Sequence, residues 1–376
     1  MKRLKKIIKR IFMSILIVIA LLIVATAIFM QQPQFGKQPA GARLERIKQS
    51  PNYRDGKFQN LSHTPDLAEG TSYYTVFKEF FFGKKERNKP QDSIPTKKED
   101  LLHLDPKENV IVWFGHSSYF MQVDGKTILV DPVFSGSVSP IGFTNKAYPG
   151  SDAYTADDFP DIDILFISHD HWDHLDYDTV LKLKSKVKKV VTGLGTAQHL
   201  EYWGYDTAII EEKDWGEHVE LGDGFTVDIT PARHFSGRSF SRNKALWVSF
   251  VLQTPSMKLF LGGDSGYDYF FKEIGDKYGP FDLAILECGQ YNEYWKYIHM
   301  MPQQVVQAAA DLKTKRLMPV HWSKFSLALH AWDESIKTVV DEAGQKGMPL
   351  FTPMIGEKTN LTDIGIPQQQ WWNELN

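Results

Sequence analysis

The chain has little cysteine: Cys288 is the only one among 376 residues. One thiol cannot form an internal disulfide, and it cannot build a zinc site from several cysteines. The sequence therefore excludes a disulfide scaffold. Any metal ion would have to be held by histidine and carboxylate side chains.

The chain also lacks a large excess of charge of either sign. It carries 43 Lys and Arg against 46 Asp and Glu, which gives a net charge of -3. A dedicated nucleic-acid-binding protein depends on many cations that neutralise phosphates, so we expect no nucleic-acid partner. With 42% hydrophobic residues the chain can bury one large core or two small ones, and this excludes global disorder.

One long apolar run lies near the N-terminus. Residues 2–10 carry six positive charges, and residues 11–30 contain only two polar side chains. Twenty helical residues span about 30 Å, the thickness of a bilayer core, so we predict a transmembrane anchor over residues 1–30 with a cytoplasmic basic tail. The positive-inside rule then places the rest of the chain outside the cytoplasm. A cleaved signal peptide is the alternative, although its apolar region usually has only about 7 to 15 residues.

Residues 31–108 contain seven prolines and show no sustained helical or strand periodicity. We interpret them as a connecting arm that lies along the main domain. Six aromatic residues crowd into residues 73–82 of this arm. We expect their rings to pack on the main core; the alternative is a surface that touches lipid or closes over an apolar substrate.

Residues 109–376 have the pattern of a mixed α/β domain. Short β-branched runs predict strands at 110–114, 119–123, 127–131, 163–168, 190–193, 225–230, 245–254, 258–263, 283–287 and 316–320. Helices are predicted at 177–189, 266–275 and 302–313. Two strand-rich halves, each with helices, predict two facing sheets with helices outside, which is an αβ/βα four-layer sandwich.

One segment, SHDHWDHLD, is rich in potential metal ligands and comes directly after a predicted apolar strand. It contains His169, His171, Asp173 and His174. Alternate residues of an extended turn point the same way, so the first two histidines can share one ion while the last two ligands turn toward a second. A segment that only caps a helix would need Asp or Ser, but not three imidazoles. The pattern therefore predicts a metal site.

Three further potential ligands each come directly after an apolar strand. They are His234, Asp264 and His321. Loops at the ends of a rigid sheet are where proteins present functional side chains. Each residue alone would be a weak signal, but together with the histidine segment they complete the three to four protein ligands that each ion of a two-metal site needs.

These motifs resemble the metallo-β-lactamase superfamily, whose H-x-H-x-D-H signature matches residues 169–174, and the resemblance covers residues 109–356. The segments WFGHSSYFMQVDGKTILVDPVFS, PARHFSGRSFSRNKALWVSF, GGDSGYD and PVHWSKFSLALH are most similar to the branch that hydrolyses N-acylphosphatidylethanolamine as a phospholipase D. A lactone-hydrolysing branch shares several of these features. Asp264 differs from the Cys expected in antibiotic-hydrolysing members.

The resemblance implies a ligand set for two zinc ions. One ion would be held by His169, His171 and His234, the other by Asp173, His174 and His321, with Asp264 bridging the two. His and carboxylate ligands also suit manganese or iron. Two such ions make hydroxide available at neutral pH for attack on a phosphodiester.

Asp173 could have a second role, and three further residues could support the site. Asp173 could also orient the attacking water or accept its proton. By resemblance, Asp131 would orient the ligand loop without binding metal itself; the alternative is a residue of a strand-end turn. By resemblance, His299 would stabilise or protonate the departing alkoxide; the alternative is a structural histidine. His116 could face the same cavity or pack structurally, and we assign it no role.

The function implied is a membrane-anchored dinuclear zinc hydrolase acting on phospholipid. It would cleave N-acylphosphatidylethanolamine-like lipids to N-acylethanolamine and phosphatidic acid. The first alternative is a lactonase or soluble phosphoester hydrolase of the same fold, which would prefer a small substrate. The second is a membrane-tethered metal-binding module without turnover, since ligands alone do not prove catalysis.

Overall fold

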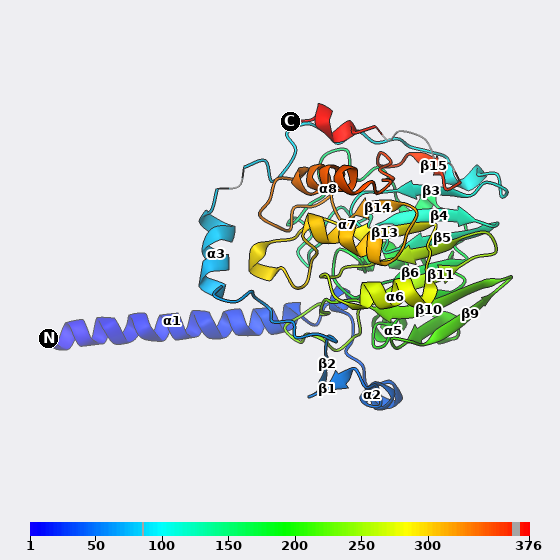
Figure 1. The fold of residues 1–376 in the computed structure, drawn as a ribbon. Coiled ribbons are helices and arrows are strands. Elements are labelled where there is room, and N and C mark those ends of the chain that lie inside the picture. Colours follow the sequence, from blue (N-terminus) through cyan, green and yellow to red (C-terminus); the bar gives the residue numbers. More distant parts are fainter. Residues whose placement is uncertain (85, 363–368) are drawn as a thin grey trace.

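The structure is a computed structural model that describes residues 1–84, 86–362 and 369–376. Two sheets stack face to face, and helices cover their outer sides (Figure 1). The predicted four-layer αβ/βα sandwich is therefore confirmed. The predicted strands are present, and their ends differ from the predicted ones by at most three residues.

The first sheet carries the N-terminal half of the domain. Among the described residues it has seven strands, in the spatial order β15 (Lys358–Asn360), β3 (Val110–Trp113), β4 (Tyr119–Val123), β5 (Lys126–Val130), β6 (Ile164–Ile167), β7 (Val190–Gly193) and β8 (Ile210–Lys213). The strands β5 to β8 are parallel to one another, and the others pair antiparallel. Strands β8 and β15 were not predicted.

The second sheet carries the C-terminal half. In the part of the chain that is described it has six strands, in the order β14 (Leu317–Val320), β13 (Leu283–Glu287), β12 (Lys258–Leu261), β11 (Val248–Gln253), β10 (Phe225–Pro231) and β9 (His218–Gly222). Strands β12, β13 and β14 are parallel, so their carboxyl ends meet at one edge of the sheet. Strand β9 was not predicted.

Strand β6 shows how the layers are packed. Ile164 and Phe166 point into the core between the sheets, whereas Leu165 and Ile167 point into a separate core under the outer helices. Successive side chains of a strand face opposite sides, so a strand buried on both sides reads as a continuous apolar run. The ring of Phe166 meets Phe250 of the second sheet at a centroid distance of 4.8 Å.

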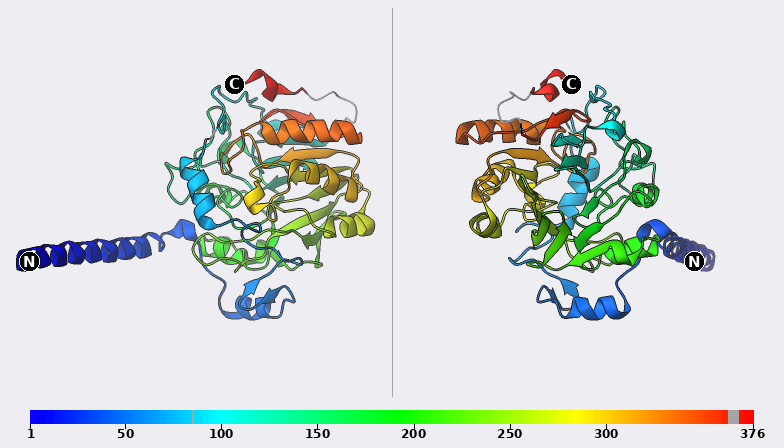
Figure 2. Two further views of the ribbon diagram at one scale, coloured as in Figure 1. Left: turned by 60° about the vertical axis from the view of Figure 1, so that its left-hand side comes forward. Right: turned by 90° about the vertical axis from the view of Figure 1, so that its right-hand side faces the viewer.

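Among the described residues, five helices cover the sandwich. Helices α4 (Tyr177–Leu183) and α5 (Ala197–Tyr202) pack on the first sheet, and α6 (Phe270–Tyr278), α7 (Pro302–Asp311) and α8 (Glu334–Lys346) lie on the side of the second (Figure 2). Helix α4 ends six residues before the predicted end, and α6 begins four residues after the predicted start. Helix α8 was missed, although Ile336, Val339 and Ala343 are buried at helical spacing.

Helix α1 (Lys2–Phe29) projects from the body of the molecule (Figure 1), and none of its residues is buried against described parts of the chain. It is long and apolar enough to cross a membrane, although a signal sequence passes the same test. The expected apolar helix is therefore present.

The arm after α1 runs along the domain but is more regular than predicted. It contains α2 (Gly41–Lys48), the short strands β1 (Tyr53–Arg54) and β2 (Lys57–Phe58), and α3 (Tyr73–Phe82). Ile47, Phe58 and Ile94 are buried in the main core. The apolar anchors are too widely spaced in sequence to show as a helical period, which explains why the two helices were missed.

The expectation that the aromatic segment packs on the core is wrong. Tyr73, Tyr74, Phe77, Phe81 and Phe82 are all more than half exposed. The spacing of residues 73, 74, 77 and 81 places these rings along one side of the helix, and their exposure shows that this side faces away from the body. Only part of the helix surface meets the body.

Candidate metal centre

The loop that follows β6 is held from behind by a buried carboxylate. Asp131, at the end of β5, accepts hydrogen bonds from the Ser168 backbone N–H at 2.8 Å and from the Ser168 hydroxyl at 2.6 Å. Its Oδ2 also lies 2.8 Å from His174 Nδ1. Because Nδ1 is engaged, the Nε2 atom of His174 is aimed at the cluster.

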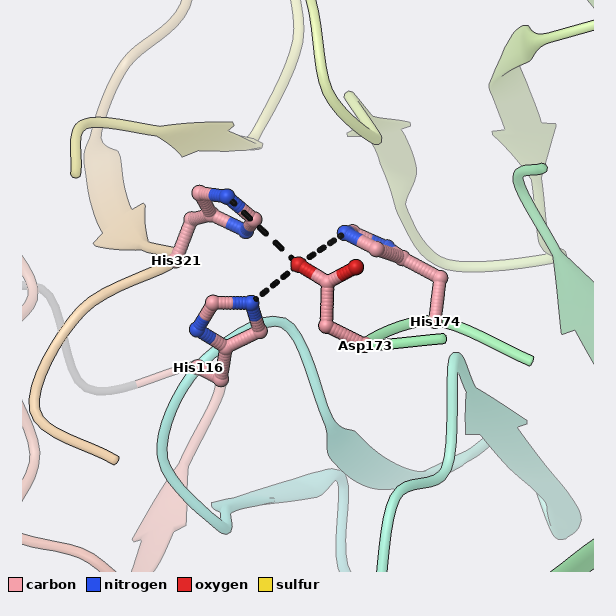
Figure 3. Close-up of side chains that lie close together, drawn as sticks. All are labelled: His116, Asp173, His174 and His321. Carbon is pink, nitrogen blue, oxygen red and sulfur yellow. Dashed lines mark hydrogen bonds and ion pairs between the residues drawn. The ribbon is translucent and has the colours of Figure 1, made fainter. Parts of the chain in front are cut away.

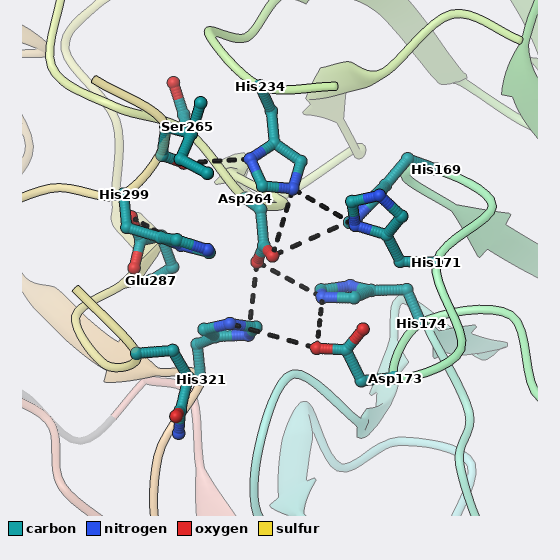
Figure 4. Close-up of polar contacts among 12 residues, drawn as sticks. His169, His171, Asp173, His174, His234, Asp264, Ser265, Glu287, His299 and His321 are labelled. Atoms are coloured by element: carbon teal, nitrogen blue, oxygen red, sulfur yellow. Dashed lines mark hydrogen bonds and ion pairs between the residues drawn. The ribbon is translucent and has the colours of Figure 1, made fainter. Parts of the chain in front are cut away.

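Three histidines converge to form a first group of donors. His171 Nδ1 lies 2.9 Å from His169 Nε2 and 3.2 Å from His234 Nε2 (Figure 4). The other ring nitrogen of His234 lies 2.8 Å from the Ile298 carbonyl oxygen, which fixes the ring orientation. These atoms are close enough to hold one ion together.

A second group surrounds Asp173 (Figure 3). Its Oδ2 lies 2.8 Å from His116 Nε2, 3.7 Å from His174 Nε2 and 4.0 Å from His321 Nε2. One donor atom from each of the four residues lies within 4.8 Å of the others, and all four side chains sit close together in the structure. His116, which received no role from the sequence, is therefore part of this group.

His116 and His321 lie on loops that hold each other. Both have a positive φ, 52° and 69°, a backbone conformation that costs a non-glycine residue about 1–3 kcal/mol. The His116 N–H donates to the Trp322 carbonyl at 2.8 Å, and the His321 N–H donates to the His116 carbonyl at 2.9 Å. These reciprocal hydrogen bonds join the loop after β3 to the loop after β14 and offset part of the strain.

Asp264 lies between the two groups, and each of its oxygens faces a different one (Figure 4). Oδ1 lies 3.2 Å from His174 Nε2 and 3.1 Å from His321 Nδ1. Oδ2 lies 3.9 Å from His169 Nε2 and 3.7 Å from His234 Nε2. A carboxylate in this position can contribute one oxygen to each of two ions.

A glycine brings Asp264 this close to the loop after β6. Gly263 has a φ of 60°, and a Cβ atom there would stand 2.8 Å from Ser168 Cβ. Any side chain at residue 263 would therefore push β12 and its carboxylate away from the histidine loop.

The ionisation states favour a bound cation. Burial lowers the pKa of His169, His234 and His321 well below the usual imidazole range, so their lone pairs are free. Burial opposes ionisation of Asp173 and Asp264, but the neighbouring imidazoles, His174 foremost, hold the pKa of both carboxyl groups well below the usual range. The cluster therefore combines neutral nitrogen donors with ionised oxygens.

The polar atoms around His174 show that the donor set fits a metal. Burial acts against a charged imidazole, yet Asp264, Asp173 and Asp131 raise the pKa of His174 well above its usual value. His174 Nε2 and Asp264 Oδ1 are buried and have no hydrogen-bond partner among the described residues. Each such orphan costs about 1–3 kcal/mol, and a shared cation would satisfy both.

His299 stands in the wall of the same site. Its ring stacks on His321 at a centroid distance of 5.3 Å, and its Nδ1 lies 3.6 Å from Glu287 Oε1. Burial raises the pKa of Glu287 to about 7. Burial lowers the pKa of His299, but the Glu287 carboxylate outweighs it and raises this pKa above its usual value.

The cluster opens into a cavity of about 290 Å³. Residues of the donor cluster form its floor, and its rim combines five apolar and four polar residues. The rim residues are Asp66, Leu67, Tyr73, Phe235, Arg242, Gln290, Trp295, Ile298 and Leu327. Tyr73 belongs to α3, so the arm contributes to the mouth of the site.

Every residue proposed from the sequence as a ligand or helper lies at this site. These are Asp131, His169, His171, Asp173, His174, His234, Asp264, His299 and His321. Sequence reasoning missed His116 and Glu287. Both come at or just after the end of a strand, the same signal that pointed to His234 and His321.

Comparison with family models gives one match over the core of the domain. Residues 126–322, more than half of the chain, match the β-lactamase superfamily domain. The matched range begins at β5 and ends two residues after β14, so it contains the loops that carry His169 to His321.

The chain is also similar to curated proteins. A protein of Mycobacterium tuberculosis is 35% identical over 331 residues, which cover 86% of this chain and 88% of the relative. The N-acyl-phosphatidylethanolamine-hydrolyzing phospholipase D 1 of Caenorhabditis elegans is 28% identical over 266 residues, covering 64% of this chain and 74% of the relative. The outer membrane protein RomA of Klebsiella pneumoniae is 54% identical over 103 residues, covering 27% and 78%.

A solved structure has the same fold. Igni18, a metallo hydrolase from the archaeon Ignicoccus hospitalis, matches with a TM-score of 0.52 and 18% identity. The match covers 67% of this chain and 98% of the archaeal chain.

Proposed function

The chain belongs to the β-lactamase superfamily, and from that premise we propose that it is a membrane-anchored dinuclear zinc phosphodiesterase of phospholipase D type. Its substrates would be N-acylphosphatidylethanolamine-like lipids. The products would be N-acylethanolamine and phosphatidic acid.

The observation that carries this proposal is the placement of Asp264 between two groups of donors. Each oxygen of one ionised carboxylate faces a different histidine group. We assign His169, His171 and His234 to one zinc and Asp173, His174 and His321 to the other, with Asp264 bridging. Bound in this way, two zinc ions would supply an activated water at neutral pH and would neutralise charge that develops on a phosphoryl group.

The protein groups around the cluster then have separate tasks. Asp173 is held by His116 at 2.8 Å, and we propose that it orients the attacking water and accepts its proton. His299 lies on the cavity side of the cluster with Glu287 behind it at 3.6 Å. We propose that this pair delivers a proton to the departing alkoxide.

A phospholipid substrate is favoured by the relatives and by the shape of the site. The Caenorhabditis elegans relative is a phospholipase D that hydrolyses N-acylphosphatidylethanolamine. The cavity has apolar walls at Leu67, Phe235, Trp295, Ile298 and Leu327, which suit acyl chains better than water. The floor provides the polar groups for a phosphodiester.

We further propose that α1 is a retained anchor rather than a cleaved signal. The six cations before the apolar run favour a cytoplasmic N-terminus, with the catalytic domain on the other side of the membrane. The similarity to an outer membrane protein of Klebsiella pneumoniae favours membrane association.

Product analysis tests the reaction. The full-length protein is reconstituted in phosphatidylcholine vesicles that contain N-acylphosphatidylethanolamine, and the products are identified by mass spectrometry. We expect phosphatidic acid and N-acylethanolamine, lost after chelation and restored by zinc. Asp264→Asn should abolish both products, whereas Asp276→Asn, which changes an exposed carboxylate on α6, should not. Release of free fatty acid instead, or no product from a metal-loaded protein, would contradict the proposal.

The size of the cavity favours one second candidate. At about 290 Å³ it lies at the lower end of ordinary ligand pockets, which have about 300–1,000 Å³. A lactone or a small phosphoester would fill it without help from a membrane. Turnover of such substrates at rates far above those on vesicle lipids would favour this alternative.

A further inference from the structure

Helix α3 carries a cluster of exposed aromatic side chains. Tyr73, Tyr74, Phe77 and Phe81 follow a spacing that places them along one side of the helix, and they are 68%, 75%, 55% and 63% exposed. Phe82, directly after Phe81, is 79% exposed. Such a contiguous aromatic surface marks an interaction site, because water is an unfavourable neighbour for it.

Helix α3 lies on the side of the body from which α1 projects. In Figure 1 both elements are on the left, and in the left view of Figure 2 they are again on the left of the body. The active-site mouth adjoins this side, since Tyr73 of α3 lines the cavity. An anchor, an aromatic helix and the mouth of the site therefore face the same way.

The end of α1 is tied to the body without a loose linker. Trp203 Nε1 donates to the Pro33 carbonyl at 2.8 Å, and the Arg238 guanidinium donates to the Gln34 carbonyl at 3.0 and 2.9 Å. Phe35 packs edge-on against Trp172 with a centroid distance of 5.4 Å. If α1 crosses a bilayer, these contacts hold the α3 side of the body against that bilayer.

We infer that α3 is a membrane-docking helix that lays its aromatic side into the interfacial region of the bilayer crossed by α1. The partner is the lipid surface itself. Tyr and Trp favour this depth because their rings have an apolar body and a polar tip, and amphipathic helices bury aromatic side chains there. Lys78 and Lys84, which are exposed on and just after α3, would reach the phosphate groups.

The contacts at the start of α3 connect docking with the catalytic site. Tyr73 donates a hydrogen bond to Asp66 Oδ2 at 3.0 Å, and Arg242 donates to the same oxygen at 3.0 Å. The Arg242 guanidinium also lies over the Phe235 ring at 4.0 Å. Phe240, two residues before the cavity-lining Arg242, is also 85% exposed. A lipid could then move from the leaflet into the cavity without crossing water, a step that rests on the proposed function.

Spin labelling of the full chain in vesicles tests the docking directly. Cys288 is fully buried, so an introduced cysteine is the reactive one. Labels are placed by Phe81→Cys on α3, by Ile19→Cys within α1, and by Asp223→Cys between β9 and β10, which lie on the opposite side of the body in Figure 1. The accessibility of each nitroxide to oxygen and to a water-soluble nickel complex reports its depth.

We expect the labels at residues 81 and 19 to favour oxygen and the label at residue 223 to favour nickel. An aqueous label at residue 81 would overturn the docking inference, whatever the depth at residue 19. Spin–spin broadening at residue 81 would also overturn it, because a second copy of the chain would then cover α3. An aqueous label at residue 19 would separately contradict the anchor.

A functional comparison separates docking from catalysis. The double variant Phe77→Ser and Phe81→Ser should lower the rate on vesicle lipids about tenfold or more, because it removes two aromatic side chains from the proposed contact with the bilayer. Its rate on a soluble phosphodiester should stay unchanged, because neither residue lines the cavity. Equal rates on vesicles for both proteins would contradict the inference. If the wild-type protein hydrolyses no lipid, the proposed function fails while the label depths still decide the docking.

Discussion

The two donor groups on either side of Asp264 differ in charge. The group of His169, His171 and His234 has three imidazoles and no carboxylate of its own, whereas the other group has Asp173 at its centre. An ion in the first group must therefore rely on Asp264 for charge compensation, while an ion in the second has two carboxylates. The two groups should therefore bind their ions with different affinities, and both affinities should depend on the shared carboxylate of Asp264.

Removing the charge of the shared carboxylate should have the largest effect. Asp264→Asn keeps the shape of the side chain but leaves the three-histidine group without a negative partner. We expect the metal content to fall at both groups and the hydrolysis rate to fall about 10³-fold. Metal analysis by mass spectrometry and initial rates would check this. If the Asp264→Asn variant retained two metal ions per chain, Asp264 would not be a ligand shared by both ions.

Asp173→Asn should distinguish the groups more sharply. Only the second group loses its central carboxylate, so we expect about one metal per chain to remain. The rate should fall about 10²-fold or more, because two-metal hydrolysis needs both ions. Calorimetric metal titration would measure the stoichiometry. Loss of both ions together would show that the groups are not independent.

Replacing Asp131, which contacts a ligand of the second group, should have a smaller effect on metal binding. Asp131→Asn weakens the hold on His174 Nδ1, and changes of this kind cost about 10–100-fold in metal affinity. Competition with a fluorescent chelator should show one weakened site and one unchanged site. Asp163→Asn, at the opposite end of β6, is a matched control that should change neither. Equal weakening of both sites would contradict the comparison.

His116→Gln should have the smallest effect. His116 Nε2 lies 2.8 Å from Asp173 Oδ2, so we expect it to position that carboxylate. Glutamine retains a donor, and the loss in affinity of the second site should be about tenfold at most. The same chelator competition would measure it. Complete loss of one ion would instead identify His116 as a ligand.

Much of the fold could be predicted because its signals are local. β6 is a four-residue apolar strand buried on both faces, and the turn residues that bound it are visible in the sequence. Helix α8 was missed although its apolar spacing is regular. Helix α2 is short and buries only Ile47, and α3 has no buried residue, so neither has a core-facing side. The exposure of α3 depends on where the arm meets the body, which no local pattern encodes.

The residues of the candidate site also differ in how far the sequence predicts them. His169 to His174 occupy six consecutive positions, so the chain itself brings them together. His116 approaches Asp173 only because the loops after β3 and β14 exchange backbone hydrogen bonds. Glu287 reaches His299 across the end of β13. Such pairings depend on tertiary packing, and a single histidine or glutamate in the sequence gives no sign of them.

Anomalous diffraction from metal-loaded crystals at the absorption edge of the bound metal would test the central claim most directly. The account predicts two peaks about 3.5–4 Å apart, one among His169, His171 and His234 and the other beside Asp173, with Asp264 between them. A single peak, or two peaks away from Asp264, would contradict the assignment of a two-metal centre.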